Sequence, residues 1–570
     1  MTFLPIMERE LRVAARKRAT IWFRVLAALV ALVIGSGFLV MNLAVGTARA
    51  RFGSGLFGTL TWMALGPALA AGIFFTADCL SEEKREGTLG FLFLTDLRGY
   101  DVVIGKLLAT SLRGAYALLA IFPVLAVTLL MGGVTGLQFW KSSLALVNAL
   151  FCSLSAGLLV SSASRNSQRA MACTFLLLLL ACIVGPVADG LRAAFRGTSF
   201  NPALSLASPA YVFWASTAFG RTAFWSGLLT SHLLGWLCFA LASWLVVRTW
   251  QDRPRRRSNA GPLRSYALKY GNTGTRAARR YKLMDPNPVT WLALRERWQS
   301  VGVWVLAVVV LCPFVAITTI LPPMAWIVWS QVSWLVVIGL YLWTASQACR
   351  FFVDARRTGL LELLVVTPLK SEDVIAGQWR ALLRTFGAPV SVLLVVQFAG
   401  MLLAQHASMG VMALRGAGPI SSLAWELFAA CVSLLSVAAN LAALMWFGMW
   451  TGLTSRNSSY AVLKTLILVQ VLPWLGISFA STLLAAAFAF GNFFTSRSPS
   501  NSAVLTFPMI TVGLGALLTL AKDVAFITWS RKRLCSDFRA EATRAIATSM
   551  AARPGTGPAV VPLPPVLSNQ

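Results

Sequence analysis

One short segment has the residue types of a phosphate-binding loop. Residues 99–108 read GYDVVIGKLL, in which two glycines precede a lysine. Such a loop needs four residues between its glycines, and a Ser or Thr after the lysine to bind magnesium. Here five residues separate Gly99 from Gly105, and Leu107 follows Lys106. We therefore exclude nucleotide binding at this segment, and no stretch of the chain is long and polar enough to form a soluble nucleotide-binding domain.

The cysteines and histidines give little basis for catalysis or metal binding. The nine cysteines form no CxxC pair, and most lie in apolar runs, where they fit small buried side chains. His232 and His406, the two histidines, are far apart in the sequence, so we expect no zinc site. Since no nucleophile, base and metal ligands converge, we expect that this chain is not an enzyme.

The composition is that of a membrane protein. Hydrophobic residues make up 57% of the 570 residues and charged residues 12%, against about 25% charged in soluble domains. A helix crosses a bilayer with about 20 apolar residues. Twelve runs meet this length: 20–45, 56–77, 108–131, 142–163, 170–191, 222–248, 299–320, 323–347, 382–404, 423–452, 460–490 and 504–529. We therefore predict an all-α polytopic membrane protein.

The basic residues orient these spans. If the N-terminus lies inside, only eight of the 49 lysines and arginines fall in outer loops: Arg49, Arg51, Lys141, Arg192, Arg196, Arg221, Arg415 and Arg497. Cytoplasmic loops carry the excess of basic residues in membrane proteins, so we expect both termini in the cytoplasm. Because each half has six spans, the two halves are predicted to be parallel repeats.

The predicted domain organisation follows from these runs. We expect a first six-helix half, a basic cytoplasmic linker, a second six-helix half and a disordered cytoplasmic tail, over residues 1–250, 251–283, 284–535 and 536–570. The densest basic run, RTWQDRPRRR at 248–257, fits an anchor at anionic lipid headgroups or a docking surface for a cytosolic partner. No further feature supports nucleic-acid binding, and we expect none.

A charged, glycine-marked segment occurs twice. Residues 84–105 and 356–377 are identical at nine of 22 positions after a shift of 272, where chance gives roughly one or two. Both copies fall between the second and third spans of their half, on the predicted cytoplasmic side. Their apolar residues recur at helical spacing, which predicts a short amphipathic helix in each copy. Such a helix docks on another protein or rests on lipid, and duplication favours the protein.

Two other features repeat. The string SRNS occurs at 164–167 and at 455–458, each time on the turn after the fourth span. An amphipathic helix is predicted before the first span of each half, and in the second half Asn287 can cap a helix that Pro288 begins.

Together these features resemble the permease half of type-2 ABC exporters. The resemblance lies in the basic amphipathic helix, the six spans and the strings EEKREGTLGFLFLTDL and VDARRTGLLELLVVTPL. It covers about 1–250 and 284–530, so two permease halves look fused in one chain. In that family the segment is a coupling helix that seats in a groove of the nucleotide-binding subunit.

The resemblance implies a set of ATPase-coupling residues in each copy. The set contains the positions that match the family motif, together with the basic residues that we expect to hold the segment in position. In the first copy they are Glu83, Lys84, Arg85, Glu86, Gly87, Thr88, Leu89, Leu94, Thr95 and Leu97. In the second copy they are Arg356, Arg357, Gly359, Leu361, Glu362, Thr367, Pro368 and Leu369.

The copies depart from the family pattern in complementary ways. The first has Asp96 in place of proline and Gly90 in place of glutamate, and the second has Leu360 in place of threonine. It therefore stays open whether both copies couple equally, or to identical subunits.

The resemblance further implies an exporter in the cytoplasmic (inner) membrane, surrounded by lipid and coupled to two cytosolic ATPase subunits. ATP and magnesium would bind to those subunits, and no cofactor to this chain. The alternative is an ion-coupled secondary transporter, which can also have two parallel six-helix halves. Such transporters place ionisable residues near mid-membrane, and this sequence has few there.

Overall fold

Helices form all the regular structure in the described part of the chain, in a computed structural model. A helix satisfies its own backbone hydrogen bonds, which the interior of a bilayer requires of any apolar segment that crosses it. The described residues are 18–45, 52–94, 98–197, 200–217, 223–249, 280–281, 284, 287–294, 303–305, 307–308, 311, 315, 322–412, 419–455, 457–494 and 501–551.

Within these residues, nine helical stretches are long and apolar enough to span a membrane. They are Gly53–Glu86, Gly99–Leu130, Gly136–Ala163, Ser167–Gly190, Phe224–Thr249, Val336–Thr358, Ser371–Gly400, Leu427–Thr454 and Ser458–Ser481. Each overlaps one predicted span. The predicted spans 20–45 and 504–529 are also helical, in α2 (Arg18–Val45) and α21 (Asn501–Ala551). Most of 299–320 lies outside the described residues. The prediction of an all-α polytopic membrane protein is confirmed.

The chain divides into two compact units. The first contains Met1–Pro262 and Leu466–Lys522, and the second contains Leu263–Thr465 and Asp523–Gln570. In the first unit, α2 packs along α20 (Leu472–Phe494), which comes from the late part of the sequence. The first unit is therefore assembled from both ends of the chain.

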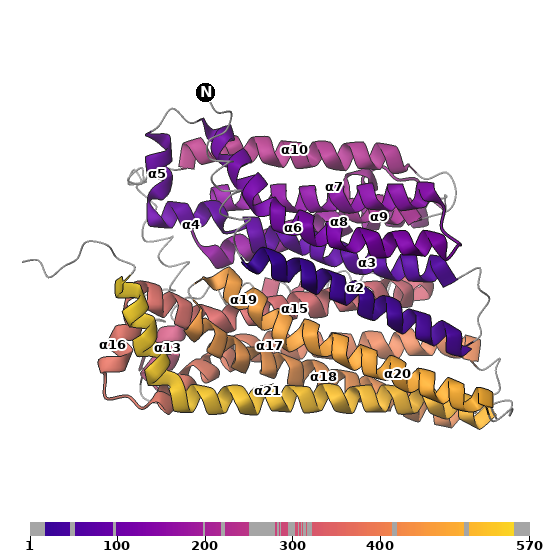
Figure 1. Cartoon of the computed structure of the whole chain (residues 1–570). Helices are drawn as coiled ribbons and strands as arrows, with labels where there is room; N and C mark the ends of the chain where they lie inside the picture. Colours follow the sequence, from indigo (N-terminus) through magenta and orange to yellow (C-terminus); the bar gives the residue numbers. More distant parts are fainter. Residues whose placement is uncertain are drawn as a thin grey trace, which may run out of the picture. The chain divides into compact units, whose positions relative to one another are not determined.

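Helix α7 (Gly136–Ala163) is the central helix of the first unit. Its apolar window is 67% buried, more than that of any other span in the described part. Four long helices pack against it: α3 (Phe52–Ala71), α6 (Gly99–Leu130), α8 (Ser167–Arg196) and α10 (Phe224–Thr249). The short α9 (Pro209–Thr217) and η3 (Ser205–Ala207) connect the last two. Figure 1 shows the long helices of this unit running alongside one another.

Small residues bring α7 against the π-helical turn η2 (Gly72–Thr76). The Gly72 amide donates to Ser153 Oγ at 2.9 Å. A Cβ on Gly157 would lie 2.1 Å from Thr76 Oγ1 and 2.5 Å from the Gly72 carbonyl oxygen. Such close backbone approach between membrane helices requires small side chains.

The second unit has a matching contact. There α15 (Pro322–Thr358) packs against α17 (Ser371–Met412) and α18 (Pro419–Thr454). A Cβ on Gly448 of α18 would lie 2.7 Å from Ala348 Cβ. Gly448 follows Gly157 by 291 positions, the shift that aligns the SRNS strings, and Ala348 follows Thr76 by 272, the shift that aligns the charged segments. The sequence repeat is therefore also a packing repeat.

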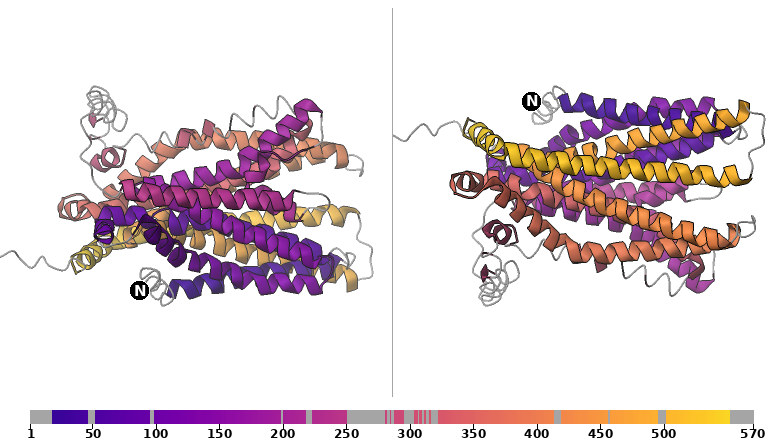
Figure 2. Two further views of the ribbon diagram at one scale, coloured as in Figure 1. Left: turned by 90° about the horizontal axis from the view of Figure 1, so that it is seen from above. Right: turned by 90° about the horizontal axis from the view of Figure 1, so that it is seen from below.

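The remaining helices differ from the predictions in extent. The span predicted at 460–490 is built from α19 (Ser458–Leu466), the π-helical η5 (Ile467–Val471) and α20. Helix α21 continues past the predicted last span to Ala551 (Figure 2), so residues 536–551 are helical, contrary to the predicted disordered tail. Helical ion pairs support this extension, as between Arg533 and Asp537 at 2.8 Å, and Phe538 is buried against Phe352.

The amphipathic helix predicted near Pro288 is present as α13 (Pro288–Ala293). Asn287 caps it, because its Oδ1 accepts a hydrogen bond from the Val289 amide at 2.9 Å. The capping side chain also donates through Nδ2 to the Asp373 carbonyl oxygen at 2.8 Å. Helix α13 is thus fixed to the beginning of α17.

Candidate functional site

The two copies of the charged segment have one backbone design. In the first copy, α4 (Cys79–Glu86) ends at Gly87, and α5 (Thr88–Phe93) follows. In the second, α15 ends at Thr358, and α16 (Leu360–Val366) begins after Gly359. Both glycines have φ 74° and ψ 1°, in the left-handed region that favours glycine. Figure 1 shows α5 lying across the end of the first-unit helices. The predicted short helices are confirmed.

One face of each short helix is buried within its own unit. Leu89 of α5 and Leu361 of α16 are both 1% exposed. Leu89 packs among residues of α4, α6, α7 and α10, including Leu80, Val102 and Val246. Burying a leucine contributes about 1.5–3 kcal/mol. These leucines therefore fasten the short helices and are not available to a partner.

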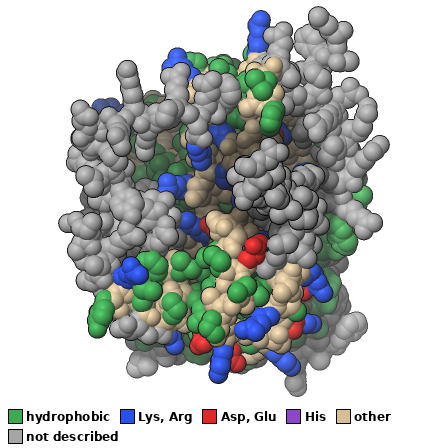
Figure 3. Space-filling view, turned by 90° about the vertical axis from the view of Figure 1, so that its left-hand side faces the viewer, with side chains coloured by type: hydrophobic (Ala, Val, Ile, Leu, Met, Phe, Trp, Pro, Cys, Tyr) green, Lys and Arg blue, Asp and Glu red, His purple; other side chains and the backbone are tan. Residues whose placement is uncertain are grey.

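The other face exposes apolar side chains. Phe91 and Leu94 are 72% and 78% exposed in the first copy, and Leu363 and Val366 are 66% and 86% exposed in the second. Both pairs are related by the 272-residue shift. A single exposed apolar residue needs no explanation, but the same pair in both copies does. Figure 3 shows hydrophobic side chains at the surface, close to lysines and arginines.

Lys84 ties the first copy to two neighbouring helices. Its Nζ donates to the carbonyl oxygen of Ser162, at the end of α7, and to Thr249 Oγ1 of α10 at 2.6 Å. Burying a charged donor costs free energy unless the donor is hydrogen-bonded. The Lys84 ammonium has two acceptors here, a carbonyl oxygen and a hydroxyl oxygen. It joins α4 to the ends of α7 and α10.

An ion pair links α4 to α6. Lys106 Nζ lies 2.6 Å from Glu83 Oε1, and the two side chains are 14% and 17% exposed. Lys106 belongs to the glycine-marked string that resembles a phosphate-binding loop. The structure gives this lysine a structural partner within the bundle.

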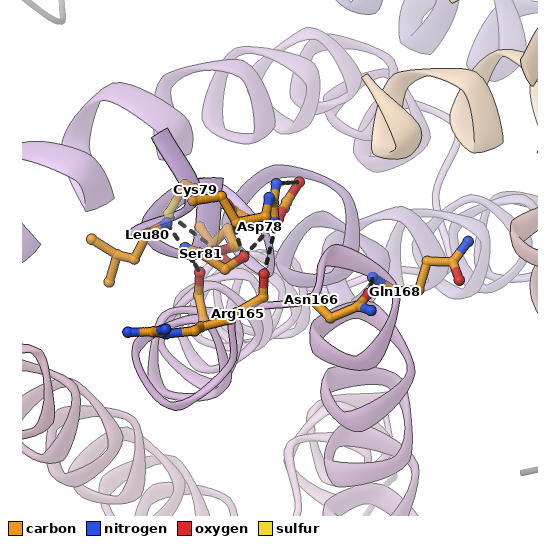
Figure 4. A network of polar contacts seen from close by, with 10 residues as sticks. Asp78, Cys79, Leu80, Ser81, Arg165, Asn166 and Gln168 are labelled. Atoms are coloured by element: carbon orange, nitrogen blue, oxygen red, sulfur yellow. Dashed lines mark hydrogen bonds and ion pairs between the residues drawn. The ribbon is translucent and has the colours of Figure 1, made fainter. Parts of the chain in front are cut away.

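Arg85 connects α4 to the SRNS turn. Its guanidinium donates to both carboxylate oxygens of Asp78, at 2.9 and 3.1 Å, and to the Arg165 carbonyl oxygen at 3.0 Å. Figure 4 shows Asp78 and Ser81 facing the turn that carries Arg165. Ser81 Oγ donates to Asp78 Oδ1 at 2.6 Å, which completes the pairing of this carboxylate. Bidentate, charge-assisted contacts of this kind fix geometry as well as position.

The preceding turn of α7 adds main-chain contacts. Ser161 Oγ accepts hydrogen bonds from the amides of Leu80 and Ser81, at 3.0 and 3.1 Å. Two amides in the first turn of α4 therefore have an acceptor on α7, as a helix end requires. Two separately repeated strings, the charged segment and SRNS, are thus brought together in the first copy.

The second copy is held by different residues. Arg350 Nε donates to Asp354 Oδ2 at 3.1 Å, and Thr358 Oγ1 donates to the Asp354 carbonyl oxygen at 2.9 Å. Arg539 of α21 donates to the Leu369 carbonyl oxygen at 3.3 Å, just after α16. The two copies share a backbone design but not an electrostatic one.

The predicted coupling residues divide by environment. Glu83 and Lys84 are partly buried and paired, Leu89 and Leu361 are buried, and Arg356, Glu362, Thr367 and Leu369 are partly buried, as is Gly359. The exposed ones are Arg85, Glu86, Gly87, Thr88, Leu94, Arg357 and Pro368. Thr95 and Leu97 lie outside the described residues.

Sequence reasoning missed Phe91, Leu363 and Val366, which carry the outward apolar face together with Leu94. The signal was present, since apolar residues stand two and five positions after the buried leucine in both copies. It also missed Asp78 and the Arg165 carbonyl, because a contact to main chain leaves no mark in the residue types. In the described part of the chain, no three His, Cys, Asp or Glu side chains gather as metal ligands would.

One comparison with known proteins gives a match, and it lies in the first half of the chain. No curated protein matches the chain. Residues 4–249, which include the first charged segment and all six spans of the first half, match the family model described as ABC-2 family transporter protein. This stretch is thus similar to the ABC-2 transporter family.

Proposed function

We propose that this chain is the permease of an ATP-driven exporter in which two ABC-2-type halves are fused. The segments 84–105 and 356–377 lie on the cytoplasmic side of the inner membrane, and each docks on a separate ATPase subunit. Those subunits bind ATP and magnesium. The N-terminus and the C-terminus are both cytoplasmic.

One observation carries this proposal. Each segment has a buried leucine, a left-handed glycine and an outward apolar pair in matching positions, namely Phe91 and Leu94, and Leu363 and Val366. A surface built twice with the same polarity is suited to two similar partners. The matching contacts of Gly157 and Gly448 support the view that the second half repeats the first, although only residues 4–249 match the family model.

The proposed mechanism is mechanical. When two ATPase subunits close on ATP, they push on α5 and α16. Because Lys84 and Arg85 fasten α4 to the ends of α7 and α10 and to the Arg165 turn, the force reaches several helices together. Packed helices respond to such a force by tilting as bodies, which can open a path through the membrane.

The test is co-purification with matched variants. The tagged full chain is isolated from its native membrane, its associated proteins are identified by mass spectrometry, and ATP hydrolysis is measured. We expect a cytosolic ATPase that is lost from the Phe91→Asp and Leu363→Asp double variant. Phe91→Leu is the control, because the second copy has leucine at the equivalent position.

Two results would count against the proposal. One is a wild-type chain that brings down no ATPase under conditions that keep the protein folded. The other is full ATPase retention by the double Asp variant. The latter would mean that the outward apolar faces of α5 and α16 do not carry the contact with the ATPase.

A further inference from the structure

A cavity of about 180 Å³ lies in the second unit, between α13, α15, the start of α16 and α17. One water occupies about 30 Å³ of liquid, so the space suits a small polar group rather than a whole lipid. Its wall is mixed in character. The polar part of the wall is formed by Arg350, Asp354 and Gln378. The apolar part is formed by Leu292, Leu382 and Phe386.

Gln378 lines this cavity and has an acceptor without a hydrogen-bond donor. The residue is 3% exposed, and its Oε1 is buried and receives no hydrogen bond from the protein. Leaving such an acceptor unpaired costs about 1–3 kcal/mol. A ligand that donates an N–H or O–H group at this point would recover that cost.

The first copy contains an ammonium group at the equivalent place. Lys106 and Glu83 correspond to Gln378 and Ala355 by the 272-residue shift. Lys106 and Glu83 form an ion pair at 2.6 Å, whereas Gln378 and Ala355 both line the cavity. The second copy thus lacks the lysine and the glutamate that form this ion pair in the first copy, and has the acceptor of Gln378 at the lysine position.

The charged pair at the cavity supplies both signs. Arg350 and Asp354 are in contact at 3.1 Å, and both line the space. An arginine has five N–H donors, so Arg350 can hold Asp354 and a phosphate oxygen together. Asp354 can pair with a cation. The apolar side chains belong to the predicted inner end of the spans, where a headgroup meets the acyl region.

We propose that this cavity binds the headgroup of a phospholipid that carries a primary ammonium. The ammonium lies near Gln378 Oε1 and Asp354, and the phosphate near Arg350. A quaternary ammonium has no N–H group to donate, so the site discriminates against choline lipids. The proposal concerns α13, α15 and α17 and does not depend on coupling to an ATPase.

The test is native mass spectrometry of the delipidated full chain in detergent, titrated with phosphatidylethanolamine, with phosphatidylcholine and with soluble phosphoethanolamine. We expect one phosphatidylethanolamine to bind at least tenfold more tightly than phosphatidylcholine, and soluble phosphoethanolamine to bind far more weakly than the lipid. The double variant Ala355→Glu, Gln378→Lys recreates the ion pair of the first copy, and the tenfold preference should disappear.

Two further variants keep the test decisive. Asp354→Asn removes one charge without adding volume, and it should also abolish the preference if the double variant does not fold. Arg380→Gln, on the exposed face of α17, should leave the preference unchanged. Equal binding of both lipids, or a preference that survives Asp354→Asn, would overturn the site. Soluble phosphoethanolamine binding as tightly as the lipid would overturn the lipid assignment.

Discussion

Arg85 donates to the Asp78 carboxylate at 2.9 Å and to the main-chain carbonyl oxygen of Arg165 at 3.0 Å. This one side chain joins the end of α4 to the turn between α7 and α8. Movement of α5 therefore cannot be absorbed by α4 alone.

The first prediction concerns Arg85 itself. Arg85→Gln leaves Asp78, which is 8% exposed, without its charge partner, so we expect a loss of about 1–3 kcal/mol in the free energy of unfolding. Denaturant unfolding of the purified chain measures this loss. Glu86→Gln is the control, because that side chain is exposed, and it should change stability little. If Arg85→Gln left the free energy of unfolding unchanged, the contact would not stabilise α4.

The second prediction concerns the left-handed glycines. An added Cβ on Gly87 or Gly359 would meet no atom within 4 Å, so the cost of Gly→Ala is backbone strain, about 1–2 kcal/mol at each position. Gly87→Asn should cost less, because asparagine tolerates this conformation. Thermal unfolding of the three variants tests the order. If Ala and Asn were equally tolerated, strain would not be the cause.

The third prediction concerns helix packing. Gly157→Ala would place a methyl group 2.1 Å from Thr76 Oγ1, so α7 must shift, and overpacking of this kind costs about 1–3 kcal/mol. Gly448→Ala should behave alike in the second unit. Gly58→Ala in α3 is the matched control, since its Cβ would meet no atom within 4 Å. Unfolding in denaturant should separate the two packed glycines from this one.

The fourth prediction concerns the ion pair between Glu83 and Lys106. A double-mutant cycle with Glu83→Gln and Lys106→Gln should give a coupling energy of about 0.5–3 kcal/mol, because both side chains are largely buried. The exposed pair of Arg544 and Glu541 should give about 0–1 kcal/mol in a parallel cycle. Equal coupling in both cycles would contradict the structural role of Lys106.

The helices could be predicted from the sequence because apolar length determines them. The repeat could be found because nine identities survive, and one of them, the pair of Gly87 and Gly359, occupies a conformation that few other residues adopt. The helical end of α21 was missed for the opposite reason. Its charged residues resemble a solvated tail until their spacing on a helix pairs Arg533 with Asp537.

The orientation of the short helices could not be predicted. In α5, Leu89 and Phe91 are both apolar, and a six-residue helix is too short for periodicity to say which one faces the bundle. That choice is made by α7 and α10, which are distant in the sequence. The acceptor on Gln378 was equally hidden, since only the packing of α13 and α15 around it leaves the oxygen without a donor.

The pairing of α2 with α20 has a consequence for biosynthesis. The ribosome completes α2 at Val45 but reaches α20 only at Leu472, more than 400 residues later. At about 5–20 residues per second, this delay lasts roughly 20–90 s. During that interval lipid, the insertion machinery or a chaperone must cover the face of α2 that later packs on α20. A chain truncated before α20 would leave this face without its partner helix.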